Sequence, residues 1–190
     1  MLALQGDYVS HATALEEIGV QPKMVRTAQD LDELDGLIIP GGESTTFLKL
    51  LAREKLFEPL QSFVANRPTF GTCAGCILLA KKVFGPEQES LGVLDASVER
   101  NAYGRQIDSE ILTTDTSLPG EPLEMVFIRA PRITEVGEGV QVLARRDGAP
   151  ILVRQNHLLA ATFHPELSDD RRVHRFFMQI VEELRGRAIS

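Results

Sequence analysis

The chain has 190 residues, of which 43% are apolar, and a net charge of −7. This length suits one compact domain, residues 1–190, with a sizeable core. The acidic balance, the lack of a Lys/Arg block, the short apolar runs and the missing basic leader argue against nucleic acid, membranes and secretion, and favour the cytoplasm.

Short apolar strands alternate with helices in the first half, which predicts βαβ units and a parallel sheet. Strands are expected at 2–5, 23–27, 36–40 and 68–70. Ser10 is expected to cap a helix that ends at Gly19, and Ser44 or Thr45 to cap helical sequence running through 47–65.

The second half is rich in β-strands, so we expect one α/β domain with a β-rich second half. Strands are predicted at 97–101, 106–115, 124–131, 140–146, 149–155 and 157–163. Apolar residues at helical spacing then predict a C-terminal helix, capped by Ser168 or Asp169 and stopped by Gly186.

Cys73 lies between Gly71 and Gly75, where a strand turns into a helix. Gly-x-nucleophile-x-Gly is the pattern of a nucleophile elbow, in which small neighbours let the backbone pass close to itself. The helix that begins at Ala74 points its N–H groups at the sulfur and favours the thiolate. We therefore interpret Cys73 as a nucleophile rather than a small buried apolar residue.

The second cysteine, Cys76, completes a CxxC sequence with Cys73. A structural zinc site is disfavoured because there is no second CxxC, and no metal is expected. A thioredoxin-like redox pair is a weaker alternative. Cys76 adjoins Ile77 and Leu78, and we expect it to pack in the core.

A cysteine nucleophile needs a base, and four histidines are present. His164 follows a strand, at the sheet edge where α/β proteins bind ligands, and Pro165 keeps it extended. Glu166 then points to the same side and can hold the imidazole. We expect the other histidines to be structural or exposed: His11 on a helix face, His157 in a solvated turn and His174 on a partly exposed helix flank.

The loop PGGEST, residues 40–45, ends another strand. Gly41 and Gly42 allow its backbone to present N–H groups to a ligand at close range. Acyl transfer needs such donors for the developing oxyanion, and the Ala74 N–H is the second candidate. A plain strand-to-helix turn is the alternative, and the loop lacks the lysine of a P-loop.

PGGEST, FGTCAG and TFHPEL, in this order, resemble the class I (triad) glutamine amidotransferases. LALQGD at the start, VERNAYGRQ at 98–106 and FIRAP at 127–131 narrow the resemblance to the glutaminase subunits of pyridoxal 5′-phosphate synthases. The resemblance covers nearly the whole chain. It implies a three-layer α/β fold with an open, mostly parallel sheet flanked by helices.

The resemblance also implies the reaction, hydrolysis of L-glutamine to L-glutamate and ammonia without a cofactor. Cys73 would form the γ-glutamyl thioester, His164 would transfer protons and Glu166 would orient it. Gly42 and Ala74 would supply the oxyanion N–H groups. The residues expected to bind glutamine are Gly42, Glu43, Ser44, Arg100, Ile128 and Arg129. An arginine can bind the substrate carboxylate as a fork, and Glu43 can bind the ammonium.

The implied partner is a (β/α)₈-barrel synthase subunit in a large hetero-oligomer, which would receive the ammonia. Docking is expected to reposition the PGGEST loop. Family members usually have a few residues before LALQG, so we expect either an upstream start or a shortened first strand. Other readings remain open: an amidotransferase of purine, histidine or anthranilate synthesis, another elbow-cysteine hydrolase, or a redox-sensing or binding module.

Overall fold

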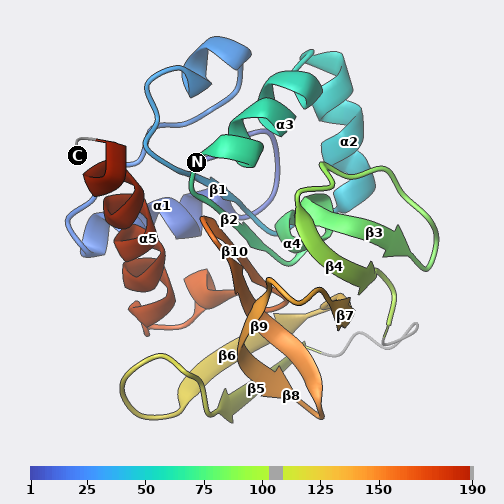
Figure 1. Cartoon of the computed structure of the whole chain (residues 1–190), viewed down its shortest axis with the longest axis vertical. Helices are drawn as coiled ribbons and strands as arrows, with labels where there is room; N and C mark the ends of the chain where they lie inside the picture. Colours follow the sequence, from blue (N-terminus) through green and yellow to red (C-terminus); the bar gives the residue numbers. More distant parts are fainter. Residues whose placement is uncertain (103–108, 189–190) are drawn as a thin grey trace.

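A five-stranded sheet forms the centre of the computed structural model, which describes residues 1–102 and 109–188 (Figure 1). The strand order is β1 (Leu37–Ile39), β2 (Thr69–Thr72), β10 (Leu158–Ala161), β9 (Ala149–Gln155) and β8 (Gln141–Arg146). β1, β2 and β10 pair in parallel, as predicted for the first half. β9 pairs antiparallel with both β10 and β8, so it alone among the five strands runs in the opposite direction.

Two smaller sheets complete the β-rich second half. One joins β3 (Ala80–Phe84), β4 (Leu94–Glu99) and β7 (Arg132–Val136), and the other is the hairpin of β5 (Ser109–Thr114) and β6 (Leu123–Ile128). β3 and β7 were not predicted, because each buries few side chains and shows no clean alternation. Residues 106–108 of the predicted strand 106–115 lie outside the described residues.

Helices cover both faces of the central sheet, which gives three layers (Figure 1). α1 (Tyr8–Glu17) and α5 (Arg172–Ala188) pack on one face, and α2 (Ser44–Arg53), α3 (Phe57–Asn66) and α4 (Ala74–Leu79) on the other. Alternation along β1 divides the core: Leu37 and Ile39 face α2 to α4, whereas Ile38 faces α1 and α5. The predicted α/β class is therefore confirmed.

The predicted strands at 2–5 and 23–27 are reduced to one parallel bridge between Leu2 and Val25. The Leu2 N–H donates to the Ile38 carbonyl at 2.9 Å, and the Val25 N–H donates to the Met1 carbonyl at 2.8 Å. Both segments thus continue the sheet beyond β1, but only over single residues.

The first helices differ from the prediction at their starts. α1 begins at Tyr8, and Ser10 lies inside it and donates a hydrogen bond to Asp7. Its end before Gly19, which has a φ of +83°, is as predicted. The sequence 47–65 forms two helices, α2 and α3, because the chain turns at Lys55, which has a φ of +53°.

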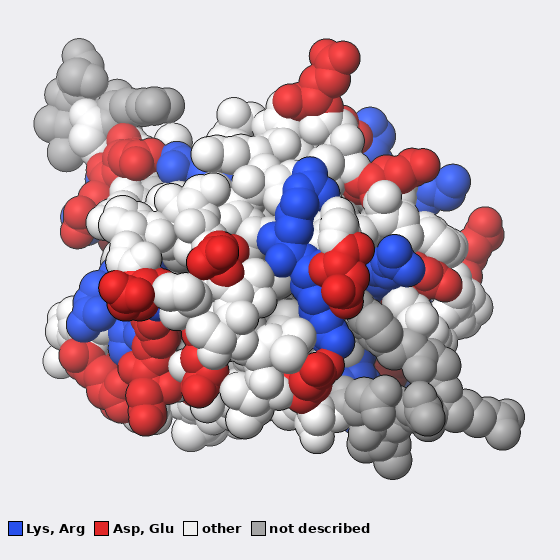
Figure 2. All heavy atoms as spheres, turned by 90° about the horizontal axis from the view of Figure 1, so that it is seen from below, with Lys and Arg blue, Asp and Glu red and all other residues white. Residues whose placement is uncertain are grey.

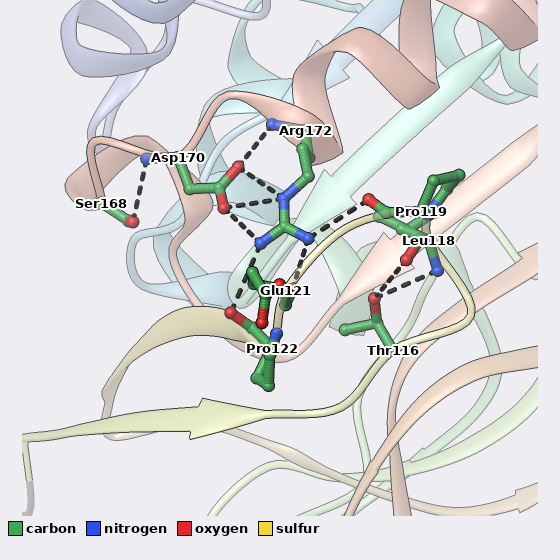
Figure 3. A network of polar contacts seen from close by, with 8 residues as sticks. All are labelled: Thr116, Leu118, Pro119, Glu121, Pro122, Ser168, Asp170 and Arg172. Atoms are coloured by element: carbon green, nitrogen blue, oxygen red, sulfur yellow. Dashed lines mark hydrogen bonds and ion pairs between the residues drawn. The ribbon is translucent and has the colours of Figure 1, made fainter.

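The C-terminal helix α5 begins at Arg172, later than predicted, and Gly186 lies inside it. The Asp170 carboxylate, rather than Ser168 or Asp169, accepts from the Arg172 N–H, at 2.9 Å. The Arg172 guanidinium binds Asp170 and reaches the loop between β5 and β6 (Figure 3). There it donates to the backbone carbonyls of Pro119, Glu121 and Pro122. This network ties the hairpin to the segment that follows His164.

Charged side chains of both signs share the surface. On the face seen in Figure 2, a narrow band of basic side chains has acidic side chains on both sides. This mixture agrees with a chain of 20 basic and 27 acidic residues. Within the described part of the chain, every helix is too short or too polar to cross a bilayer.

Candidate active site

Cys73 occupies a tight elbow between β2 and α4, as predicted. Its φ of +49° and ψ of −104° lie in a region that side chains rarely adopt. A Cβ on Gly71 would lie 2.6 Å from the Gly75 carbonyl carbon, and one on Gly75 would lie 2.1 Å from the Ile39 oxygen. The Cys73 N–H donates to the Ala161 carbonyl at 2.9 Å, which fixes the elbow against β10.

Cys76 is fully buried in the core, as predicted. Burial, and then the charge of Cys73, raise the pKa of the Cys76 thiol to about 12. Such a thiol forms little thiolate at neutral pH, and the thiolate is the form that takes part in disulfide exchange. The CxxC sequence is therefore poorly suited to be a redox pair.

His164 and Glu166 lie directly after β10. The backbone N–H of His164 donates to the Val126 carbonyl of β6 at 2.8 Å, so the β5–β6 hairpin holds this residue in place. The His164 Nδ1 lies 2.7 Å from Glu166 Oε1. Both side chains are buried, with 7% and 5% of each residue exposed. The two side chains meet as predicted, but the backbone is not extended, because Pro165–Leu167 form a 3₁₀ helix that begins after His164.

The imidazole of His164 also faces the sulfur of Cys73. Burial alone lowers the pKa of His164, but hydrogen bonds to Cys73 and Glu166, together with their charges, outweigh it and raise the pKa to about 10. The ring is then protonated at neutral pH, between a sulfur and a carboxylate. The structure thus brings Cys73 together with His164 and Glu166, which lie far from it in the sequence.

Cys73 and His164 share a cavity of about 280 Å³. Every residue expected to bind glutamine lines the same cavity: Gly42, Glu43, Ser44, Arg100, Ile128 and Arg129. Ala74 is the first residue of α4, so its N–H has no partner within the helix. Another cavity, of about 320 Å³, lies beside Arg154 and Glu183. None of the triad residues Cys73, His164 and Glu166 lines it.

Glu43 is the N-cap of α2, a role predicted for Ser44 or Thr45. Its carboxylate accepts from the N–H groups and hydroxyls of Thr45 and Thr46, whereas the Ser44 hydroxyl donates to Gln88 at 2.8 Å. Burial raises the pKa of Glu43, but these hydrogen bonds prevail and lower it to about 2. The wall of the cavity therefore keeps a negative charge.

Two arginines line the same cavity as Glu43. Arg100 Nη2 lies 3.5 Å from Glu43 Oε1, and its side chain is 11% exposed. Its buried Nε has no hydrogen-bond partner among the described residues. Arg129 is exposed and has a φ of +44°. The cavity thus offers a buried guanidinium with a free N–H and a second one open to solvent.

The backbone of Gly41 and Gly42 lies close to the side chains of His164 and Gln5. A Cβ on Gly41 would lie 2.4 Å from His164 Cε1, and one on Gly42, which has a φ of +146°, would lie 2.9 Å from Gln5 Nε2. Gln5 Nε2 also donates to the Glu43 carbonyl at 2.8 Å. The loop is held between the first segment of the chain and the His164 ring.

Some lining residues were not predicted. Asp7, Ile77 and Asn101 line the cavity, as does Gly41, whose backbone was expected beside the ligand. Asn101 adjoins the predicted Arg100, so the neighbouring position was the available signal. No sequence pattern pointed to Asp7 or Ile77.

Two of the other histidines, His157 and His174, are more buried than expected, whereas His11 has the structural place expected of it. His174 was expected on a partly exposed flank, but it is fully buried and its Nε2 lies 3.0 Å from His11 Nδ1. His11 is also fully buried, and its Nε2 lies 3.1 Å from Glu166 Oε2. His157 is half-buried and bonds the Val64 carbonyl at 3.0 Å instead of facing solvent. These contacts arise from the tertiary packing of segments that are far apart in the sequence. No sequence pattern indicated them.

Comparisons with known proteins give a consistent result. The chain is 60% identical over 181 residues to pyridoxal 5′-phosphate synthase subunit PdxT of Koribacter versatilis (strain Ellin345), covering 95% of this chain and 94% of that protein. It is 48% identical over 184 residues to the subunit of the same name from Thermotoga maritima, covering 96% and 98%.

A solved structure described as a glutamine amidotransferase superposes with a TM-score of 0.88 at 46% sequence identity, covering 95% of this chain and 97% of that one. Residues 1–183 match the SNO glutamine amidotransferase family. The match spans both the first half, with Cys73, and the late segment with His164 and Glu166. The chain therefore belongs to the SNO glutamine amidotransferase family.

Proposed function

We propose that this protein is the glutaminase subunit of a pyridoxal 5′-phosphate synthase and hydrolyses L-glutamine to L-glutamate and ammonia in the cytoplasm. One observation carries the proposal: Cys73, on a strained elbow, faces the protonated His164, which is hydrogen-bonded to Glu166, in the wall of a cavity. The names of the relatives support the choice of pathway.

Glutamine would bind through its two charged groups. Its carboxylate fits Arg100, whose buried Nε lacks a partner among the described residues, with Arg129 as the second cation. Its ammonium fits the negatively charged Glu43 carboxylate. Ser44 and Ile128 would flank the chain of the substrate, and the side-chain amide would reach Cys73.

The first half-reaction is attack of the Cys73 thiolate on the amide carbon. The oxyanion that forms is stabilised by the N–H groups of Gly42 and Ala74. His164 then gives its proton to the amide nitrogen, the C–N bond breaks, and ammonia leaves a γ-glutamyl thioester on Cys73. Glu166 holds the imidazole throughout by its hydrogen bond to Nδ1.

The second half-reaction is hydrolysis of the thioester. Neutral His164 takes a proton from water, and the oxygen attacks the thioester carbon at the same oxyanion site. The C–S bond breaks, which releases glutamate and restores the thiolate beside the imidazolium. No cofactor or metal is needed for either step.

The ammonia would pass to a (β/α)₈-barrel synthase subunit in a hetero-oligomer. We further propose that docking reorients the Gly41-Gly42 backbone and completes the oxyanion site. Gly42 supports this because its φ of +146° belongs to a region that glycine enters freely. Equal glutaminase rates with and without the synthase would remove the case for activation by docking.

The test is ammonia release from glutamine in the presence and absence of the synthase subunit. Wild type is expected to turn over glutamine faster with the synthase, and Cys73→Ala to show no turnover in either condition. Turnover by Cys73→Ala equal to wild type would overturn the proposed reaction. The proposed pathway would be overturned if the synthase of a different amidotransferase pathway raised the glutaminase rate and the pyridoxal 5′-phosphate synthase subunit did not.

A further inference from the structure

Behind the Glu166 side chain, a chain of buried polar groups continues into the core. It consists of His11 from α1, Thr72 from the end of β2 and His174 from α5, and none of these side chains lines the cavity. All are fully buried, with 0% exposure. Buried polar groups are costly unless they are paired, so this chain needs a physical explanation.

The contacts form a continuous path to the triad. Glu166 Oε1 contacts His164 Nδ1 at 2.7 Å, and Glu166 Oε2 lies 3.1 Å from His11 Nε2. The same His11 nitrogen bonds Thr72 Oγ1 at 3.0 Å. Its approach to Glu166 Oε2 is a close polar contact and not a hydrogen bond, because that oxygen has no hydrogen-bond partner among the described residues. On the other side of the ring, His11 Nδ1 lies 3.0 Å from His174 Nε2.

These distances select one arrangement of protons. A bare His11 Nε2 would set a lone pair against a carboxylate oxygen 3.1 Å away, so Nε2 carries the proton and donates it to Thr72. His11 Nδ1 is then an acceptor and takes the proton of His174 Nε2–H. His174 Nδ1 is left bare, and this atom has no hydrogen-bond partner among the described residues. The opposite arrangement would bury an unpaired N–H there, which costs about 1–3 kcal/mol.

The surroundings keep both rings neutral, as this arrangement requires. Burial, followed by the charges of His174 and His164, lowers the pKa of His11 well below its usual range. Burial and the charge of Arg171 lower the pKa of His174 to about 4, against a weaker opposing effect of Glu17. Each ring therefore has one donor and one acceptor nitrogen. The hydrogen bonds then all run the same way, from His174 to His11 and from His11 to Thr72.

We propose that His11 and His174 are positioning residues of the glutaminase, a pair of imidazoles that holds the second oxygen of Glu166 and fixes its plane against His164. This inference rests on the proposed function and deepens it. A carboxylate held by one oxygen can rotate about its side-chain bonds, whereas contacts to both oxygens fix its orientation. His174 acts one step further away, by selecting the His11 tautomer.

The activity test compares two substitutions of His11 in the complex with the synthase. His11→Leu removes the donor and is expected to lower kcat about 10- to 100-fold, as the loss of such supporting partners does elsewhere. KM for glutamine should stay near that of wild type, because His11 does not line the cavity. His11→Gln keeps an N–H at similar reach and should recover most of the lost kcat.

Phe177→Leu is the matched packing control. Phe177 lies on α5, in the apolar core between the central sheet and the helices α1 and α5. Its ring is 5.7 Å from that of Phe70, and its side chain has no polar atom. It should lower the melting temperature but leave kcat near that of wild type. An unchanged kcat in His11→Leu would overturn the proposal, and so would a loss that Phe177→Leu matches or that His11→Gln fails to recover.

A second readout needs neither turnover nor a variant with altered activity. Nitrogen NMR of the imidazoles in the wild-type protein should show His11 as the neutral Nε2–H tautomer at neutral pH. A charged ring or the Nδ1–H tautomer would overturn the proposal, even if His11→Leu does not fold. Absence of wild-type turnover would instead contradict the proposed function, so the two failures are distinguishable.

Discussion

The two sides of the His164–Glu166 pair are built in different ways. Toward the cavity, the groups sit on loops with uncommon backbone angles, with φ of +49° at Cys73, +146° at Gly42 and +44° at Arg129. On the opposite side, His11 and His174 project from the regular helices α1 and α5. The side that meets the substrate is strained and partly open, and the side behind it is regular and fully buried.

This difference shows how the protein can maintain strained residues at its site. Uncommon backbone angles at residues other than glycine cost about 1–3 kcal/mol each and persist only where packing determines them. The helices and strands behind the site provide that packing, because the elbow is pinned between β1 and β10. Substitutions on the cavity side should therefore change chemistry or binding, and those behind it should change orientation or stability.

The largest effect should come from the base itself. His164→Asn removes the proton donor and acceptor and is expected to lower kcat about 10⁴-fold or more, whereas Glu166→Gln should be roughly 100-fold milder because the residue only orients the ring. Steady-state ammonia release with the synthase present measures both.

Cys76→Ala is the control for this pair of substitutions. The thiol of Cys76 is buried outside the cavity, so the variant should lose stability and keep its kcat. Should Glu166→Gln abolish activity as fully as His164→Asn, the carboxylate would have to do more than orient the imidazole.

A smaller effect is expected for substrate binding. Arg100→Ala removes the guanidinium proposed to hold the substrate carboxylate, and should raise KM for glutamine about 10- to 100-fold, the value of a charge-assisted hydrogen bond of about 1.5–3 kcal/mol. Arg154→Ala is the control, since Arg154 pairs with Glu183 beside another cavity. An unchanged KM in Arg100→Ala would show that the carboxylate binds elsewhere.

The mildest test changes only a protonation equilibrium. Against the lowering effect of burial, contacts to Cys73 and Glu166 raise the pKa of His164 from 6.5 to about 10. Its contribution to stability is thus complete below pH 6.5 and is lost as the pH rises through about 10. In Cys73→Ala one raising partner is gone, so NMR titration should find a lower pKa. The same pKa in both proteins would place the sulfur out of contact with the ring.

The cavity side was largely predictable from the sequence. Glycines at 71 and 75 mark the close approach at the elbow, and the glycines at 41 and 42 mark the loop beside the ring. His164 follows an apolar strand, so its place at the sheet edge followed from the fold class. These signals exist because sharp turns and close backbone contacts permit few residue types.

The buried side could not be predicted in the same way. His11 and His174 lie 163 positions apart, and only the packing of α1 and α5 on one face of the sheet brings them together. The weak strands were missed for a related reason: β3 exposes Lys81 and Lys82, so its sequence does not alternate. Helix starts were displaced because the carboxylates of Glu43 and Asp170 bind the first N–H groups, where Ser44 or Thr45 and Ser168 or Asp169 were expected to do so.

The central claim is that the Cys73 sulfur attacks glutamine inside the cavity. Labelling with a glutamine-mimicking electrophile, followed by mass spectrometry of the complex with the synthase, tests it directly. We expect one label on Cys73, none on the buried Cys76, and protection by added glutamine. Labelling that spares Cys73, or that glutamine does not slow, would contradict it.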